Sequence, residues 1–229
     1  MAKRRAQVSV AQGRWTGVAL DHQIQPASSN PVVLNGQALA VWRGEDGPVR
    51  VWEDRCPHRG MRLSFGFVRG NTLRCIYHGW AYGADGQCAE IPAHPALAPP
   101  KTICANSYPA ETRYGIVWTT LGDGASGPPD LGPDEGWEGV RSLFVAASAE
   151  AALTALARFD FGAGATTRML AGDIVEVSFG PELRMLVVVQ AMDDERAALH
   201  AAAKGARATE ERAALAKRLE RLRADIEQA

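Results

Sequence analysis

Two short segments, each with one cysteine and one histidine, constrain this chain more than any other feature of its sequence. The first is Cys56–Gly60 (CPHRG) and the second is Cys75–Trp80 (CIYHGW). A set of two thiolates and two imidazoles does not suit haem, but it suits two other kinds of metal site. One is a single zinc ion, and the other is a [2Fe–2S] cluster with cysteine on one iron and histidine on the other.

The way the two ligand types are shared between the segments favours the cluster. Zinc-finger sites usually pair like ligands, two cysteines close together and then two histidines close together. Here Cys56 is followed by His58, and Cys75 by His78. A cluster with two different irons needs this mixing, because each of two loops must reach both irons. The spacing therefore predicts a [2Fe–2S] cluster and leaves zinc as the less favoured alternative.

Three stretches of this region resemble the Rieske domain of the Rieske non-haem iron oxygenases, the terminal components of ring-hydroxylating and demethylating systems. The family patterns are C-P-H-R-G, C-x-Y-H-G-W and G-x-C-x-x-I-P. They are met by Cys56–Gly60, Cys75–Trp80 and Gly86–Pro92, and the similarity covers residues 14 to 122. The resemblance implies a Rieske-type [2Fe–2S] cluster held by two loops of a small antiparallel β domain.

The resemblance also implies roles for single residues. The expected ligands, cysteines on the inner iron and histidines on the outer one, are Cys56, His58, Cys75 and His78. The residues expected to surround them are Arg59, Gly60, Tyr77, Gly79 and Trp80. Respiratory Rieske proteins carry an extra cysteine in each ligand loop. Neither loop here has one, so we expect Cys88 and Cys104 to be ordinary reduced cysteines.

Composition argues against several other classes of protein. With 229 residues, 46% of them hydrophobic, the chain is long enough for one or two packed domains. Its net charge of −1 argues against a general nucleic-acid binder. No stretch approaches the roughly 18–20 apolar residues of a membrane span, and the basic start lacks the apolar core of a secretory signal. Because four cysteines, two of them expected ligands, fit a reducing compartment, we expect a cytoplasmic protein.

Strand and turn signals divide the chain into three parts. Residues 10–125 predict short strands with turns, such as the hairpin signal Asn35-Gly36, and are expected to form the Rieske-type domain. Residues 126–139 are rich in Gly, Pro and Asp and predict a linker. Residues 140–229 predict a small α+β region that ends in a helix over 209–228 with one apolar stripe. The expected fold class is therefore mainly β.

The second region lacks the iron ligands expected of a complete oxygenase. Family members hold one iron there through two histidines and a carboxylate, in a helical Asp-x-x-His-x-x-x-x-His pattern. This chain has five histidines, and outside the ligand loops no two are close in sequence. Asp160 is followed by Ala163 and Arg168 at the two histidine positions, and neither side chain can ligate iron. We therefore expect a truncated or degenerate catalytic domain and no mononuclear iron on this chain.

The sequence also gives an expected position or role for four other residues. By resemblance, Asp160 would bridge a Rieske histidine of one subunit to the catalytic iron of its neighbour, and a surface or capping role is the alternative. His94 is expected in a loop, and His22 and His200 are expected on the surface.

The sequence leaves three functional alternatives open. The favoured one is an electron-transfer subunit, incomplete as an enzyme by itself, within an oligomer that involves neither membrane nor nucleic acid. It would take electrons from a flavin reductase or a ferredoxin and pass them to a mononuclear iron on an oxygenase catalytic subunit. The second alternative is a complete but divergent oxygenase with an unrecognised iron site, for example one including His200. The third, a free Rieske ferredoxin, does not explain the long region beyond the cluster domain.

Overall fold

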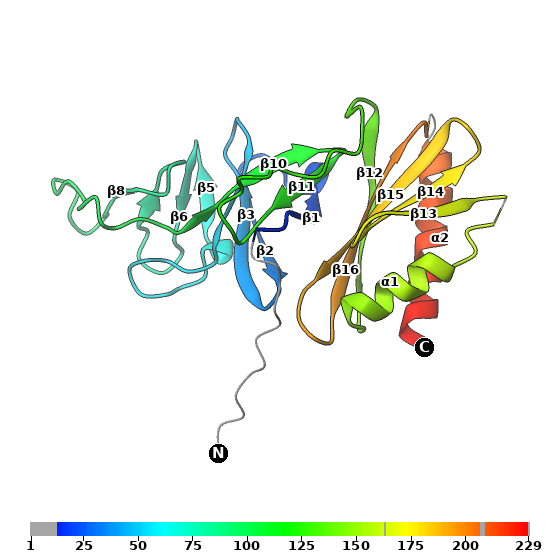
Figure 1. The fold of residues 1–229 in the computed structure, drawn as a ribbon. Coiled ribbons are helices and arrows are strands. Elements are labelled where there is room, and N and C mark those ends of the chain that lie inside the picture. Colours follow the sequence, from blue (N-terminus) through cyan, green and yellow to red (C-terminus); the bar gives the residue numbers. More distant parts are fainter. Residues whose placement is uncertain (1–12, 163, 207–208, 229) are drawn as a thin grey trace, which may run out of the picture.

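The computed structural model describes residues 13–162, 164–206 and 209–228, and it shows a mainly β chain in two parts. Figure 1 shows a first part built of small sheets beside a second part in which one larger sheet is covered by two helices. All strand pairs are antiparallel, as the sequence predicts. No helix among the described residues is both long enough and apolar enough to cross a membrane.

The first part contains three sheets. The three-stranded sheet has the order β1 (Thr16–Leu20), β11 (Ile116–Thr119), β10 (Ala110–Arg113). A four-stranded sheet has the order β2 (Ser28–Leu34), β3 (Gln37–Arg43), β4 (Val49–Glu53), β9 (Ser107–Tyr108). The last has the order β5 (Phe67–Arg69), β6 (Thr72–Arg74), β7 (Ala81–Tyr82), β8 (Cys88–Glu90). Two short 3-10 helices are η1 (Asp21–Gln23) and η2 (Leu63–Phe65).

The predicted hairpin turn at Asn35-Gly36 is confirmed. It joins β2 to β3, with Leu34 paired to Gln37. Both turn residues have positive φ, 51° and 77°, which is the geometry that the right-handed twist of a two-residue hairpin requires. The tip of this hairpin also reaches the second part, where Asn35 N donates to Ala191 O at 2.9 Å.

The second part is one five-stranded sheet with two helices on one face. The strand order is β12 (Trp137–Val145), β16 (Ala197–Lys204), β15 (Leu183–Ala191), β14 (Ile174–Phe179), β13 (Thr166–Ala171). The helices are α1 (Ala149–Arg158) and α2 (Thr209–Gln228). Ser148 caps α1 by accepting a hydrogen bond from Ala151 N at 3.2 Å.

The apolar stripe predicted for the last helix packs against its own domain. Its four members, each at most 5% exposed, are Leu215, Leu219, Leu222 and Ile226. They share one core with inward-facing valines and alanines of the sheet. Burial of each such side chain stabilises the fold by roughly 1.5–3 kcal/mol, so this contact holds α2 on the sheet.

The opposite face of the large sheet packs on the first part. Ile116 and Trp118 of β11 share a buried core with Leu186 and Val188 of β15. Gly17 lies at this interface, because a Cβ there would approach Ile116 Cγ2 of β11 to 2.8 Å and Val188 Cγ1 of β15 to 3.2 Å. The two parts are therefore joined by a packed apolar interface.

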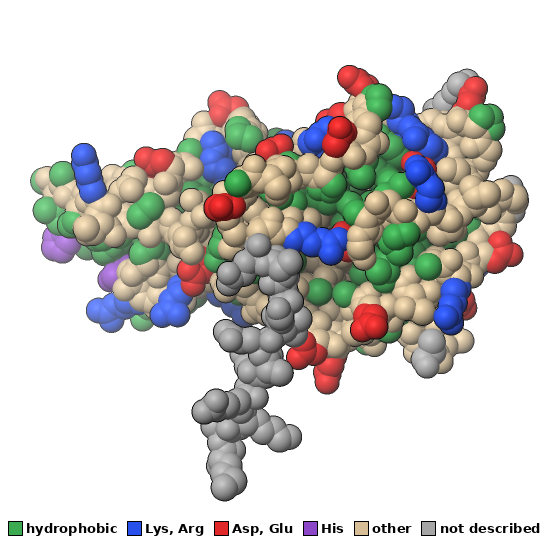
Figure 2. Space-filling view, in the orientation of Figure 1, with side chains coloured by type: hydrophobic (Ala, Val, Ile, Leu, Met, Phe, Trp, Pro, Cys, Tyr) green, Lys and Arg blue, Asp and Glu red, His purple; other side chains and the backbone are tan. Residues whose placement is uncertain are grey.

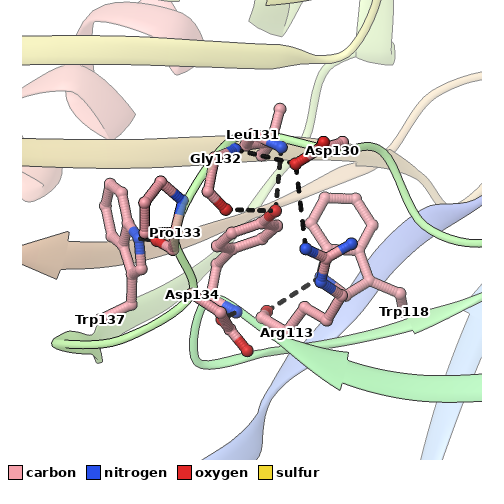
Figure 3. Close-up of polar contacts among 9 residues, drawn as sticks. Arg113, Trp118, Asp130, Leu131, Gly132, Pro133, Asp134 and Trp137 are labelled. Carbon is pink, nitrogen blue, oxygen red and sulfur yellow. Dashed lines mark hydrogen bonds and ion pairs between the residues drawn. The ribbon is translucent and has the colours of Figure 1, made fainter.

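The segment predicted as a linker is a packed excursion that closes over Tyr114. The Tyr114 hydroxyl accepts from Leu131 N at 2.9 Å and donates to Gly132 O at 3.2 Å. Figure 3 shows this segment beside Trp137, whose indole Nε1 donates to Pro133 O at 3.3 Å. β12 begins at Trp137, so the stretch without regular structure ends before residue 139.

His200, which was expected on the surface, is buried at the junction, and that expectation was wrong. His200 lies on β16, and alternate side chains of that strand face the first part of the chain. Only 2% of His200 is therefore exposed. Ser142 Oγ lies 2.8 Å from its Nδ1, and Gln190 Oε1 lies 2.7 Å from its Nε2. Gln190 Nε2 in turn donates to Val33 O at 2.7 Å, which ties the network to β2. Burial lowers the pKa of His200 to about 4.

The depressed pKa of His200 predicts a loss of stability in acid. The unfolded histidine, with a pKa of about 6.5, binds its proton at a higher pH than the folded one. Stability is therefore full above pH 6.5 and falls as the pH drops toward 4, by about 1 kcal/mol between pH 7.5 and 5.5. Thermal unfolding at both pH values should show a smaller shift for His200→Gln than for the natural chain. The exposed control His22→Gln should shift as the natural chain does, and equal shifts in all three would contradict this account.

Candidate metal centre

The four expected ligands lie on two loops at the end of the first part. The first loop follows β4, and the second connects β6 to β7. Figure 2 shows histidine side chains at the end of the molecule that lies farthest from the two helices. Residues separated in sequence are therefore brought to one exposed tip.

The two loops have the same hydrogen-bond pattern. In each, the cysteine N–H donates to a carbonyl five residues later, and the cysteine carbonyl accepts from the glycine four residues later. The four bonds, all between 2.7 and 2.9 Å, are Cys56 N to Met61 O, Gly60 N to Cys56 O, Cys75 N to Trp80 O and Gly79 N to Cys75 O. Gly60 and Gly79 have φ of 74° and 71°, a conformation that favours glycine. Each loop thus holds its cysteine and histidine in an equivalent turn.

Thiols point inward and imidazoles point outward. Cys56 and Cys75 are each 2% exposed and belong to one buried core. His58 is half-buried and His78 is exposed, with ring centroids 4.8 Å apart. An inner pair of sulfurs and an outer pair of nitrogens fits a binuclear cluster in which one iron takes two Cys and the other takes two His.

The electrostatics of the four ligands also fit such a cluster. Burial is the main cause that raises the pKa of the Cys75 thiol. Two buried thiols ionise readily only beside strong positive charge, which a pair of iron ions supplies. Burial, followed by the charges of His78 and Arg59, lowers the pKa of His58. The neutral imidazole is the form that ligates a metal.

The residues predicted to surround the ligands lie close to them. The Trp80 indole stacks on the His58 ring, with centroids 4.1 Å apart and planes 6° apart. The Tyr77 ring lies 3.8 Å from that of His78, and Arg59 is exposed. Because Trp80 covers His58, the His78 imidazole is the more open of the two.

Two features near the ligands were missed by sequence reasoning. Tyr82 is fully buried, and its hydroxyl lies 3.1 Å from Cys56 Sγ. Burial, followed by the hydrogen bond with Cys56, raises the pKa of Tyr82 far above its usual value, so the hydroxyl remains a donor. The buried thiol of Cys88 lies in the same core, and burial raises its pKa. The available signal for Tyr82 was its position two residues after Trp80, directly beyond the second ligand loop.

The segment that carries Asp160 does not form a helix. Asp160 is exposed in the loop after α1, where its Oδ1 accepts from Gly162 N at 2.7 Å. Ala163 lies outside the described residues. Arg168 is on β13 and pairs with Glu176 at 3.0 Å. The helical arrangement of the family's iron-binding pattern is therefore not present here, and the bridging role of Asp160 stays a prediction.

The remaining histidines are not grouped. His22 is exposed, as predicted, and His94, which was expected in a loop, is exposed in a turn after β8. Among the described residues, no three His, Cys, Asp or Glu side chains are grouped as ligands of a single metal ion.

Sequence comparison places the loops in a known domain. The profile of the Rieske [2Fe-2S] domain matches residues 14–109. Oxidoreductase NdmD of Pseudomonas putida is 42% identical over 110 residues, which are 48% of this chain and 19% of NdmD. The vanillate O-demethylase oxygenase subunit of a Pseudomonas species is 38% identical over 105 residues, 46% of this chain and 31% of that protein. The match thus spans less than a third of the length of either relative.

Structural comparison extends the likeness of fold to the second part. Pseudomonas putida NdmA matches with a TM-score of 0.70 at 20% identity, over 95% of this chain and 81% of that one. Dicamba monooxygenase matches with a TM-score of 0.72 at 17% identity, over 96% of this chain and 88% of that one. At this level of identity the likeness concerns the fold.

The contact between Tyr82 and Cys56 predicts a measurable effect on the cluster. A hydrogen bond to a ligand sulfur favours the more negative, reduced state. Tyr82→Phe removes this donor and should lower the reduction potential by on the order of tens of millivolts, with iron content unchanged. Protein-film voltammetry measures the shift. Tyr77→Phe is the matched control, because the Tyr77 ring lies beside His78 but its hydroxyl forms no hydrogen bond with a described residue. This change should leave the reduction potential nearly unchanged. Equal potentials for Tyr82→Phe and the natural chain would contradict the assignment.

The loop geometry, the burial of the thiols and the sequence match agree with one another. The fold of at least 95% of the chain is similar to those of NdmA and dicamba monooxygenase. Residues 14–109 are therefore a Rieske [2Fe-2S] domain, and the chain is related to the components of Rieske oxygenases.

Proposed function

We propose that this chain is the Rieske electron-transfer subunit of a multicomponent non-haem iron oxygenase. In this role it receives single electrons from a flavin reductase or a ferredoxin and passes them to a mononuclear iron on a partner subunit. The observation that supports the proposal is a combination of two features. The two loops with the expected ligands lie at an exposed tip, and the second domain behind them has an apolar interior.

The tip is suited to one-electron exchange. Two neutral imidazoles in place of thiolates give a Rieske cluster a higher potential than an all-cysteine plant-type cluster. Cys56 and Cys75 anchor the inner side in the core, and the Tyr82 hydroxyl lies 3.1 Å from Cys56 Sγ, where it could donate to a ligand thiolate. The exposed His78 offers the shortest exit toward a protein docked at the tip.

The interior of the second domain supports the view that the catalytic iron is elsewhere. The space between the sheet and the two helices is filled by a core of buried apolar side chains. His200 lies on the other face of the sheet, and both of its ring nitrogens are engaged, by Ser142 and Gln190. It therefore offers no free nitrogen to an iron in this arrangement.

One polar cavity contains residue types that can ligate iron. It measures about 390 Å³ and is lined in part by His22, Asp21 and Glu138. Arg43 pairs with Asp21, and Arg212 pairs with Glu138. A cavity whose two carboxylates are already neutralised by arginine has little attraction left for a dication.

A free Rieske ferredoxin is the less economical alternative. The second domain contributes five strands and two helices and shares a buried core with the first. A diffusing carrier does not need this addition, whereas a subunit of an assembly uses it as a contact surface.

The proposal is tested by probing the isolated, cluster-loaded chain for an open ferrous site. The chain is given ferrous iron and then nitric oxide without oxygen, because a mononuclear ferrous iron with open positions forms a nitrosyl that EPR detects. We expect one electron per chain in the cluster and no added ferrous nitrosyl. A sample without added iron identifies signals from the cluster itself. A nitrosyl signal near one per chain would establish the divergent complete oxygenase instead.

A further inference from the structure

Exposed apolar side chains are concentrated at the ligand tip. Of the eight large apolar side chains that the described residues expose, five lie on or beside the two ligand loops. They are Phe65 (55%), Phe67 (41%), Ile76 (58%), Tyr77 (55%) and Leu97 (53%). Leu97 belongs to a third loop, which reaches the second ligand loop where Pro92 lies against Gly79. A soluble chain that gathers its apolar side chains in one place marks an interaction surface.

Positive charge is concentrated at the same end. Residues 55–84 contain five arginines and no Asp or Glu, and residues 91–110 contain Lys101 and no Asp or Glu. With Asp85 and Glu90 included, residues 55–110 have a net charge of +4, in a chain whose net charge is −1. The rest of the molecule is thus acidic, and the end that exchanges electrons is basic.

The basic side chains nearest the ligands are available to a partner. Arg55, Arg59 and Arg62 are exposed, and none of them forms an ion pair with a described residue. Arg74, in contrast, is occupied by Glu90 at 2.6 Å. The Arg62 guanidinium lies over the Phe65 ring, 5.7 Å from its centroid, so charge and apolar surface alternate in one patch.

We infer that this tip surface docks an acidic electron-carrier protein, whose apolar patch is rimmed by carboxylates and which delivers its electron through His78. The inference rests on the proposed function and names the kind of donor. Carboxylates complement the unpaired arginines, and the apolar patch covers Ile76 and Tyr77, which flank His78. The step is a one-electron exchange in which the carrier is oxidised and the cluster is reduced.

The mixed character of the patch favours a transient partner. Single apolar side chains separated by solvated arginines resemble the small, polar interfaces of electron-transfer pairs more than the apolar core of a permanent dimer. Exposed charges of this kind act mainly on the rate of association, and salt screens them.

The experiment uses an acidic plant-type [2Fe–2S] ferredoxin as the probe. Its potential lies below that of Rieske clusters, so transfer to this chain is downhill. Stopped-flow absorbance gives the second-order rate of reduction of the cluster-loaded chain at low and high salt. For the natural chain the rate should fall at least tenfold as salt rises, because screening removes the attraction.

Charge reversal identifies the surface. The double variant Arg59→Glu, Arg62→Glu should react about tenfold or more slowly than the natural chain at low salt and lose most of its salt dependence. Arg158→Glu, an exposed reversal on α1 at the other end, should stay within twofold of the natural rate. Leu97→Ser should raise the half-saturating ferredoxin concentration several-fold at high salt, where the apolar contact carries the docking.

The outcomes separate the inference from the function on which it rests. Equal rates for the natural and double-reversal chains, or a rate that rises with salt, would overturn the docking surface while leaving the electron-transfer role intact. A chain that dithionite fails to reduce and air fails to reoxidise would instead refute the electron-transfer role. A loss of rate in Arg158→Glu as large as in the double variant would show a general charge effect and would also overturn the surface.

Discussion

Two buried thiols at one end of a small β domain are the constraint on which the rest of the molecule depends. Cys56 and Cys75 have almost no contact with water, and such thiols are costly to ionise unless a metal group lies beside them. Matching hydrogen bonds within each loop hold both cysteines inward and both histidines outward. This arrangement puts the two imidazoles at the surface and the two thiols in the core.

The second domain acts on the ligand tip only indirectly. Its sheet has one face filled by helices and the other packed on the first domain, and the buried His200 connects the two through Ser142 and Gln190. Both faces of the sheet are therefore packed against other parts of the chain. In the proposed assembly the packed chain holds the cluster in place. The tip, with its exposed arginines and apolar side chains, remains accessible to redox partners.

The parts of the site that depend on short sequence motifs were predictable. The two matching turns around Cys56 and Cys75, with their glycines, follow from two local patterns, and the Asn35-Gly36 turn and the stripe of α2 follow from equally local signals. Tyr82 and His200 were not found because their roles depend on residues far away in sequence, such as Cys56 and Ser142. Alternation along a strand shows that two residues share a face, but it does not show what that face meets.

The iron and acid-labile sulfide content of the purified chain, expressed alone, tests the central claim most directly. The account predicts two irons and two sulfides per chain, with no zinc, because Cys56, His58, Cys75 and His78 hold one binuclear cluster. One zinc without sulfide would contradict the cluster itself. Three irons with two sulfides would show a mononuclear site on this chain and would contradict the separation of the two metal centres.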